Sequence, residues 1–328
     1  MTDAVPRESA PTMQDVWTAR SRLGSIAVRT PLTEAAALGE AVGGTVLLKH
    51  EEMQPIGAFK VRGAVNTLLA RSEAGPLTGA VTFSTGNHGM GVAYAARRLG
   101  LPAYVCLPDE VPQAKLDGLG RLGAHVELCG PTQEDAARRA AELELERGLT
   151  PVAPFDDPDV IAGQGTIGLE MLAADPRIDA VIVPVSGGGL LAGVALAVKS
   201  NAPAVRVIGV CAEGARAMYE SVRAGRPVDF TESPTLADSL RGGIGAQNRH
   251  TLRLTQAFVD DLVLVSEQEI EQAMRFLLRE ERLVVEGAAA VGVAALLSGR
   301  VPANRRTAVL ITGRNVAGDV LARLAAGD

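Results

Sequence analysis

The stretch Gln54-Pro55-Ile56-Gly57-Ala58-Phe59-Lys60-Val61-Arg62-Gly63-Ala64 places a single lysine between an aromatic residue and the first residues of a helical pattern. A turn-like Pro-Ile-Gly precedes the lysine, and apolar residues recur at helical spacing from Val61 to Leu68, so we expect a helix that begins at Lys60. Burial beside the Phe59 ring would lower the pKa of Lys60 and leave a free amine that can form a Schiff base with a carbonyl. A lysine considered alone more often extends its ammonium to the surface, so the choice depends on the rest of the chain.

Length and composition indicate a two-domain α/β protein that binds a small molecule. The 328 residues are too many for one small core and too few for three, which favours two domains. Apolar residues make up 47% of the chain and aromatic residues only 3%. The net charge is −6, and no run of like charges suggests a nucleic-acid partner.

Cysteine usage and the apolar runs predict a cytoplasmic location. Cys106, Cys129 and Cys211 are too far apart for a zinc site, and we expect buried free thiols. The longest apolar run, 288–297, is too short to cross a bilayer, and the first residues lack the apolar core of a signal peptide. We therefore expect no membrane partner.

Strands and helices alternate along most of the chain. The pattern predicts strands at 45–49, 80–83, 103–107, 125–129, 181–185, 205–211 and 307–311. It predicts helices at 13–23, 87–99, 113–122, 133–147, 188–199, 267–280, 286–298 and 316–325. This alternation is typical of βαβ units on parallel sheets. We expect a large domain from residues 1–76 and 155–328, and a small domain from residues 77–154.

A glycine cluster, Ser186-Gly187-Gly188-Gly189-Leu190, follows a predicted buried strand and opens a helix. Successive glycines let backbone N–H groups converge on one point, and the helix N-terminus adds partial positive charge, so the cluster suits a phosphate. The alternative is a turn that only tightens the packing of strand and helix.

A second glycine pattern, Gly163-Gln164-Gly165-Thr166-Ile167-Gly168, has the spacing of a dinucleotide fingerprint. It does not follow a strand, and no acidic residue downstream is placed to bind a ribose hydroxyl. We therefore reject a nicotinamide site here, although an oxidoreductase built on this pattern remains a third hypothesis.

Two further polar motifs follow predicted strands. Ser84-Thr85-Gly86-Asn87-His88-Gly89 combines hydroxyls, an amide and an imidazole at a helix start, which suits a small carboxylate. The alternative is an ordinary helix cap with a structural histidine. Thr312-Gly313-Arg314-Asn315 follows the last strand, where α/β sheets place ligand-binding loops.

Together, these motifs occur in the order and spacing of the fold type II pyridoxal-phosphate enzymes. The sequence resembles the serine/threonine dehydratase and serine racemase branch over about residues 15–320. The resemblance implies an α/β fold of the tryptophan synthase β type, with two doubly wound parallel or mixed sheets and the cofactor in the crevice between the domains. It also implies pyridoxal 5'-phosphate as cofactor, an amino acid as substrate and a homodimer.

The resemblance assigns a role to individual residues, with Lys60 as the catalytic residue that forms the Schiff base. The cofactor-binding residues that it implies are Phe59, Lys60, Asn87, Ser186, Gly187, Gly188, Gly189, Leu190, Glu286 and Thr312. The substrate-binding residues that it implies are Ser84, Thr85, Asn87, His88, Ser239 and Arg314. A threonine hydroxyl is a weaker partner for the pyridine nitrogen than a carboxylate, which favours elimination over transamination.

The implied activity is that of a lyase that dehydrates a β-hydroxy amino acid by α,β-elimination and releases ammonia and a keto acid. The alternatives are serine racemase-like activity and a non-catalytic small-molecule sensor on the same scaffold. The segment 234–245 and Arg314, where relatives usually have glycine, resemble the hydroxyectoine-utilisation dehydratase subgroup. The substrate is then threonine- or serine-like, or a hydroxylated diaminobutyrate. Cys211 and Ala217 stand where racemases have carboxylates, so we expect no tight divalent-metal site.

Overall fold

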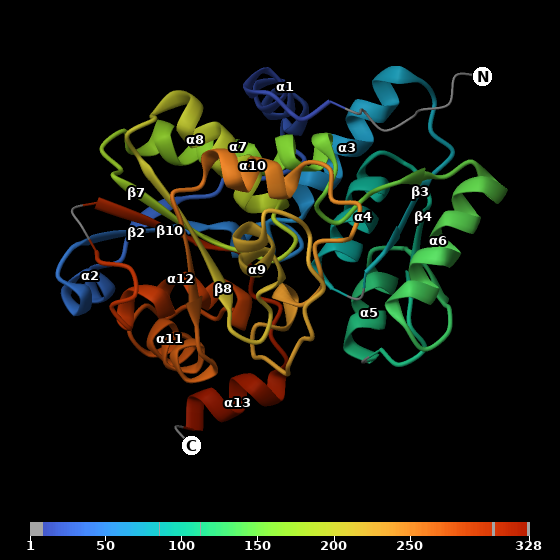
Figure 1. Cartoon of the computed structure of the whole chain (residues 1–328). Coiled ribbons are helices and arrows are strands. Elements are labelled where there is room, and N and C mark those ends of the chain that lie inside the picture. The colour runs from blue at the N-terminus through green and yellow to red at the C-terminus, as the bar shows by residue number, and fades with distance from the viewer. Residues whose placement is uncertain (1–8, 85, 112, 304–305, 327–328) are drawn as a thin grey trace. The chain divides into compact units, whose positions relative to one another are not determined.

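A computed structural model describes residues 9–84, 86–111, 113–303 and 306–326 of the chain (Figure 1). The chain divides into two compact units, which we call unit 1 (Met1–Val28 and Lys60–Gln164) and unit 2 (Arg29–Phe59 and Gly165–Asp328). One of the points at which the chain passes from unit 2 to unit 1 lies directly before Lys60.

Unit 2 is built on a six-stranded sheet with the strand order β1-β2-β10-β7-β8-β9. The strands, in this order, are Leu32–Glu34, Thr45–His50, Arg306–Ile311, Ala180–Pro184, Arg206–Ala212 and Asp261–Val265. Only β1 runs antiparallel to its neighbour; the other described pairs are parallel. The central strands read as continuous apolar runs because helices cover both faces of the sheet.

Successive strand residues of unit 2 enter two separate hydrophobic clusters. Leu48 and Val309 pack with α11 and α12 on one face, whereas Leu47 and Ala308 pack with α8 on the other. Unit 2 is therefore doubly wound, with α12 and α8 on opposite sides of the sheet in Figure 1. Its helices are α2 (Ala36–Val42), η1 (Glu51–Met53), α8 (Gly189–Asn201), α9 (Ala217–Ala224), η2 (Asp238–Leu240), α10 (Thr251–Phe258), α11 (Glu267–Arg279), α12 (Gly287–Leu297) and α13 (Gly318–Ala326).

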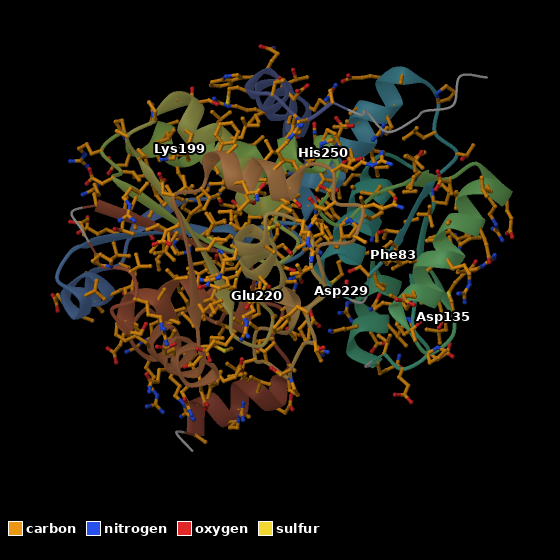
Figure 2. The ribbon with its side chains drawn as sticks, viewed as in Figure 1. Phe83, Asp135, Lys199, Glu220, Asp229 and His250 are labelled. Atoms are coloured by element: carbon orange, nitrogen blue, oxygen red, sulfur yellow. The ribbon has the colours of Figure 1, made fainter. Side chains whose placement is uncertain are left out.

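Unit 1 contains a smaller parallel sheet of four strands in the order β5-β4-β3-β6. These strands are His125–Leu128, Ala103–Leu107, Ala80–Phe83 and Thr150–Pro151. Its helices are α1 (Met13–Leu23), α3 (Val61–Ala74), α4 (Asn87–Arg98), α5 (Gln113–Arg121), α6 (Gln133–Arg147) and the first part of α7 (Pro158–Ala174). Local sequence determines the start of α6, where Asp135, which is labelled in Figure 2, forms a capping box with Thr132.

The structure confirms the α/β class and the predicted strands and helices to within one or two residues at each end. Nine of the described elements were not predicted, namely β1, α2, η1, β6, α7, α9, η2, α10 and β9. The four-stranded sheet lies within residues 77–154 and the six-stranded sheet outside them. The predicted domain limits follow these sheets rather than the two units, and they stay a prediction.

The cysteines differ from one another in burial. Cys106 and Cys211 are buried in β4 and β8, and burial raises the pKa of each thiol to about 12. Cys129 is partly exposed just beyond β5, so the expectation of three buried thiols is wrong for this residue. In the part of the chain that the structure describes, no helix is long and apolar enough to cross a membrane.

Candidate active site

Three of the predicted motifs meet at one edge of the six-stranded sheet in unit 2. Strands β2, β10 and β7 are parallel neighbours, so their carboxyl ends lie at the same edge. The segment that leads to Phe59 follows β2, the segment from Thr312 follows β10, and the glycine cluster from Ser186 follows β7. Ligand sites of α/β sheets are found at such carboxyl ends.

The segment that leads to Lys60 pairs with the segment that follows β10. Phe59 donates its backbone N–H to the Thr312 carbonyl at 3.0 Å, and Arg314 donates to the Gly57 carbonyl at 2.9 Å. The residues between them form an antiparallel bridge. This pairing fixes the backbone directly before Lys60.

Gly57 is required by its conformation and by its neighbours. Its φ of +72° lies in the left-handed region, and a Cβ atom would lie 2.9 Å from Asn315 Oδ1 and 3.2 Å from Arg314 Cγ. The Asn315 amide also donates to the Ile56 carbonyl at 2.9 Å. The two segments, around Gly57 and around Asn315, therefore approach each other more closely than a residue with a side chain at position 57 would allow.

The glycine cluster forms an uncapped helix start. Gly188 has φ +88°, and a Cβ atom there would lie 2.5 Å from Met218 Cε and 3.0 Å from Thr251 Cβ. No side chain of the described residues caps α8, whose first helical hydrogen bond runs from Ala192 to Gly188. The N–H groups of the first turn are left for an anion, as the phosphate prediction requires.

Thr312 and Glu286 are buried in unit 2 near the end of β10. Thr312 is 2% exposed, and its hydroxyl makes no hydrogen bond with any described residue. Glu286 donates its backbone N–H to Gly313 at 3.1 Å, and its Oε1 would lie 2.6 Å from a Cβ atom at Gly313. The Thr312 hydroxyl is thus available to a ligand atom.

Unit 1 contains the Lys60 amine. Lys60 precedes the first residue of α3, and its Nζ donates a hydrogen bond to the Pro154 carbonyl at 2.7 Å. Helix α4 lies close behind, because a Cβ atom at Gly91 would lie 3.2 Å from the Lys60 carbonyl carbon. Lys60 is therefore the N-cap residue of a buried helix, which begins one residue after the predicted start, and its amine faces the segment that follows β6.

His88 is a buried neutral imidazole. Burial lowers the pKa of His88 to about 3, and the positive charge of Lys60 adds to the shift. Its Nε2 lies 3.0 Å from the Val152 carbonyl, and since a carbonyl only accepts, Nε2 carries the proton. Nδ1 is then an acceptor, which argues against a hydrogen bond from His88 to a substrate carboxylate.

The start of α4 carries the other predicted substrate residues. Ser84 follows β3, and its hydroxyl accepts a 3.3 Å hydrogen bond from the Gly86 N–H. Asn87 is the first residue of α4, and no described side chain caps this helix. Thr85 lies outside the described residues. An uncapped helix start suits a carboxylate for the same reason that α8 suits a phosphate.

Sequence reasoning missed the residues that hold the connector before α7. Asp157 caps α7, because its Oδ1 accepts from the N–H groups of Asp159 at 2.8 Å and Val160 at 3.1 Å. Its Oδ2 forms an ion pair with the buried Arg71 at 3.0 Å. The Asp-Pro pair at 157–158 is a helix-start signal that could have been found, but nothing in the sequence marks the Pro154 carbonyl.

The residues predicted at the far end of the substrate are exposed. Ser239 lies in η2, and Arg241 pairs with Glu232 at 3.3 Å. The Arg314 side chain lies along Gly57, and its guanidinium makes no hydrogen bond or ion pair within the described ranges. The alternative to a pocket role for Arg314 is a side chain that points to solvent or to a carboxylate such as Glu286. No ion pair with Glu286 is found, and the exposure of Arg314 fits the solvent alternative.

The G-x-G-x-x-G pattern lies inside α7, not between a strand and a helix. A Cβ atom at Gly163 would lie 2.8 Å from the Arg62 carbonyl in α3, and one at Gly168 would lie 3.0 Å from Ala197 Cβ in α8. These glycines permit close helix packing, which supports the rejection of a nicotinamide site.

Comparison with known proteins relates the chain to pyridoxal-phosphate enzymes over most of its length. Residues 25–313 match the family described as "Pyridoxal-phosphate dependent enzyme". The L-threonine ammonia-lyase of Thermotoga maritima is 40% identical over 313 residues, which cover 95% of this chain and 78% of that protein. The catabolic L-threonine dehydratase TdcB of Escherichia coli is 38% identical over 307 residues, 93% of each chain. The solved structure of maize serine racemase is 31% identical with a TM-score of 0.91, and the match covers 97% of this chain and 98% of that one.

Proposed function

The chain belongs to the family of pyridoxal-phosphate dependent enzymes, and on this basis we propose that it is a lyase that dehydrates a β-hydroxy amino acid. Its architecture is that of fold type II, as the sequence resemblance implied. The observation that carries the proposal is the Lys60 amine. The amine lies 2.7 Å from the Pro154 main-chain carbonyl. Lys60 itself stands at the start of a buried helix and directly follows a segment whose backbone is hydrogen-bonded to the residues after β10.

The residues of each unit fit the cofactor. In unit 2 the uncapped start of α8 would bind the phosphate, and the uncommitted Thr312 hydroxyl would face the ring nitrogen. In unit 1 Lys60 would hold the cofactor covalently through its amine. When it is bound, pyridoxal phosphate withdraws electrons from the substrate Cα and so acidifies the proton on that carbon.

The side chains of this protein then have separate tasks. With the cofactor bound, the Lys60 amine would remove the Cα proton of the substrate. The β-hydroxyl would leave as water, so that the proton lost from Cα is balanced by the proton that the hydroxyl gains. Ser84 and the N–H groups at the start of α4 would bind the substrate carboxylate. A neutral threonine hydroxyl at the ring nitrogen favours elimination over transamination. The released product hydrolyses in water to a keto acid and ammonia.

A spectrum and an activity assay together test this function. The purified protein should be yellow, lose its visible band on borohydride reduction with Lys60 as the modified residue, and release a 2-keto acid from L-threonine. A colourless protein that binds amino acids without turnover would instead be a sensor on the same scaffold.

For the substrate, we propose that the extra polar atoms of a hydroxylated diaminobutyrate would be recognised through Arg314. The support is its unpaired guanidinium within the described residues, beside the segment that leads to Lys60. L-Threonine and L-serine should then be poor substrates, and Arg314→Gly should lower turnover of the larger substrate more than that of threonine. Arg241→Gly is the matched control, because Arg241 already pairs with Glu232. A kcat/KM for L-threonine of about 10⁴ M⁻¹s⁻¹ or more would make threonine the substrate instead.

Racemisation is the second candidate activity, favoured by the similarity to maize serine racemase. The sequence resemblance places Thr85 where racemases have a serine on the second face of the substrate, and a β-branched threonine has fewer rotamers. We therefore expect elimination to exceed racemisation. Chiral chromatography in which D-serine forms from L-serine faster than pyruvate would reverse this assignment.

The homodimer, the cytoplasmic location and the absence of a tight divalent-metal site stay proposals. Sedimentation of the purified protein tests the first, and fractionation of cells tests the second. Activity after chelation and after readdition of Mg²⁺ tests the third, and a strong loss that Mg²⁺ restores would contradict it.

A further inference from the structure

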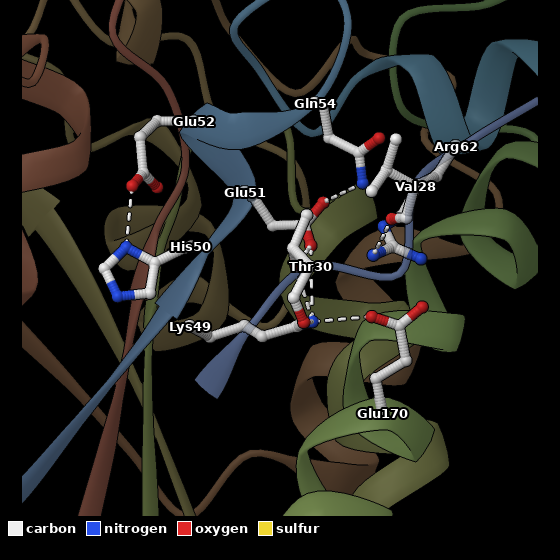
Figure 3. A network of polar contacts seen from close by, with 9 residues as sticks. All are labelled: Val28, Thr30, Lys49, His50, Glu51, Glu52, Gln54, Arg62 and Glu170. Atoms are coloured by element: carbon white, nitrogen blue, oxygen red, sulfur yellow. Dashed lines mark hydrogen bonds and ion pairs between the residues drawn. The ribbon is translucent and has the colours of Figure 1, made fainter. Parts of the chain in front are cut away.

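A cluster of buried polar side chains lies behind the segment that leads to Lys60. We call it the Lys49 network, and its members, all in unit 2, are Thr30, Lys49, Glu51, Gln54 and Glu170 (Figure 3). Lys49 is 1% exposed, and Glu51 and Gln54 are fully buried. Buried charges of this kind are costly unless they are paired, so the network demands a specific arrangement.

Lys49 is the centre of the network. Its Nζ donates to the Thr30 hydroxyl at 2.6 Å, to the Thr30 carbonyl at 2.7 Å and to Glu170 at 2.5 Å, and it lies 3.7 Å from Glu51. The adjacent His50 points to the other face of β2, where it pairs with Glu52 at 2.7 Å (Figure 3). Lys49 therefore connects two carboxylates at the end of β2.

Glu51 differs from Glu170 because it also reaches the chain ahead of Lys60. One Glu51 oxygen accepts from the Thr30 hydroxyl at 2.5 Å, and the other accepts from the Gln54 amide at 3.1 Å. The main-chain carbonyl of Gln54 in turn accepts a hydrogen bond from the Gly57 N–H at 2.7 Å. A continuous series of hydrogen bonds thus runs from the core of unit 2 to the turn three residues before Lys60.

We propose that Glu51 is a positioning residue for Lys60 and acts through Gln54. The backbone pairing with the segment after β10 holds the end of this turn, and Glu51 holds its beginning. With both ends held, the turn restricts the backbone before Lys60 to one conformation. Less conformational entropy is then lost when the amine reacts with the cofactor carbonyl. This inference rests on the proposed function, because it assumes that Lys60 carries the cofactor.

Glu51→Gln and Glu170→Gln form a matched pair of variants. Each removes one carboxylate charge from around Lys49, and Glu51→Gln also removes the charged acceptor of the Gln54 amide at the start of the turn ahead of Lys60. Both variants should lower the thermal midpoint of the apoprotein. Only Glu51→Gln should change how Lys60 captures the cofactor.

The experiment adds pyridoxal phosphate to cofactor-stripped full-length protein and follows the return of the visible band. For Glu51→Gln we expect the rate constant to fall about ten-fold, because one charged acceptor oxygen becomes an amide group and the two hydrogen bonds to Glu51 can no longer both be made to a carboxylate. For Glu170→Gln we expect a change within about two-fold. Hydrogen exchange in residues 54–59 should rise in Glu51→Gln alone, a change that a general loss of stability would not confine to this segment.

Gln54→Met is the second variant, which keeps the inference testable if Glu51→Gln does not fold. It removes the contact to the turn but leaves both carboxylates around Lys49, so it should slow the return of the band as Glu51→Gln does. Equal slowing in Glu51→Gln and Glu170→Gln, or normal rates in Glu51→Gln and Gln54→Met, would overturn the positioning role. A wild-type protein that never forms the band would remove the proposed function itself, and this inference with it.

Discussion

Two segments act on Lys60, and they are held in different ways. The segment Glu51–Phe59, which leads into Lys60, is tied at its start by buried side chains and at its end by backbone pairing. In the connector Val152–Asp157, the Pro154 main-chain carbonyl accepts a hydrogen bond from the Lys60 amine at 2.7 Å. Neither segment was recognised from its own sequence as an anchor.

This difference determines which substitutions can change the position of each segment. A side-chain anchor such as Glu51 can be removed by one substitution. The Pro154 carbonyl persists in every variant, so the connector can be disturbed only through the residues that place it. Asp157, at the end of the connector, and its partner Arg71 are the candidates for this role.

Lys60→Ala should have the largest effect, because it removes the group that both segments serve. Turnover should fall by about 10⁴-fold or more, since the side chain supplies both the covalent link and the base. Elimination rate and absorbance band should be measured on one preparation, with thermal unfolding as the check that the fold is intact. Near-normal turnover in this variant would end the proposed mechanism.

Asp157→Ala tests the connector. It removes one of two carboxylates from the buried Arg71 guanidinium, which keeps Asp159 at 3.5 Å, and it removes the cap of α7. The free energy of unfolding should therefore fall by about 2–4 kcal/mol. Turnover should fall as well, because the Pro154 carbonyl loses its support.

Glu73→Ala is the control for Asp157→Ala. It breaks the ion pair of Glu73 with Arg22, in which the Glu73 side chain is 58% exposed, and should cost less than about 1 kcal/mol. Urea titrations of both variants give the comparison. Equal losses in the two would mean that the Asp157 pair is not structurally important.

Gly57→Ala tests the segment ahead of Lys60, and Gly43→Ala is its match. Both glycines have φ +72°, but a Cβ atom at Gly43 meets nothing within 4 Å, whereas at Gly57 it would meet Asn315 and Arg314. Gly43→Ala should cost about 1 kcal/mol from backbone strain alone, and Gly57→Ala about 2–3 kcal/mol. Cofactor capture should slow only in Gly57→Ala; if the two variants behave alike, the close approach to Asn315 has no role.

His88→Gln should have the smallest effect, and only in acid. The folded pKa of His88, about 3, lies below its unfolded value, so its contribution to stability is complete above about pH 6.5 and is lost as pH falls toward 3. At pH 5.5 this loss amounts to about 1.4 kcal/mol. A glutamine amide can still donate to the Val152 carbonyl, and it does not titrate. On going from neutral pH to acid, the free energy of unfolding should therefore fall less in the variant than in wild type.

The profile of unfolding free energy against pH measures this difference. It should be flatter for His88→Gln between pH 6.5 and pH 4, and the two profiles should run parallel above pH 7. A ring resonance of His88 that titrates near its ordinary pKa would contradict the buried neutral imidazole.

Local patterns in the sequence predicted most of the fold because glycines, apolar periodicity and strand-end motifs report on nearby backbone. They identified Lys60 at a helix start, the glycine cluster before α8 and the polar residues after β3 and β10. They missed α7 because Gly163, Gly165 and Gly168 were considered as a dinucleotide fingerprint and not as part of a helix. These glycines are tolerated there because Gly163 and Gly168 permit close contact with other helices.

The sequence by itself determined which residues could bind a phosphate and form a Schiff base, since those capacities belong to residue type and local backbone. Only the tertiary structure decided what holds Lys60. The Pro154 carbonyl carries no signal of its own, because every residue has one. Glu51 and Glu170 become partners of Lys49, and differ in what else they contact, only after β2 and α7 have brought together residues that are distant in the chain.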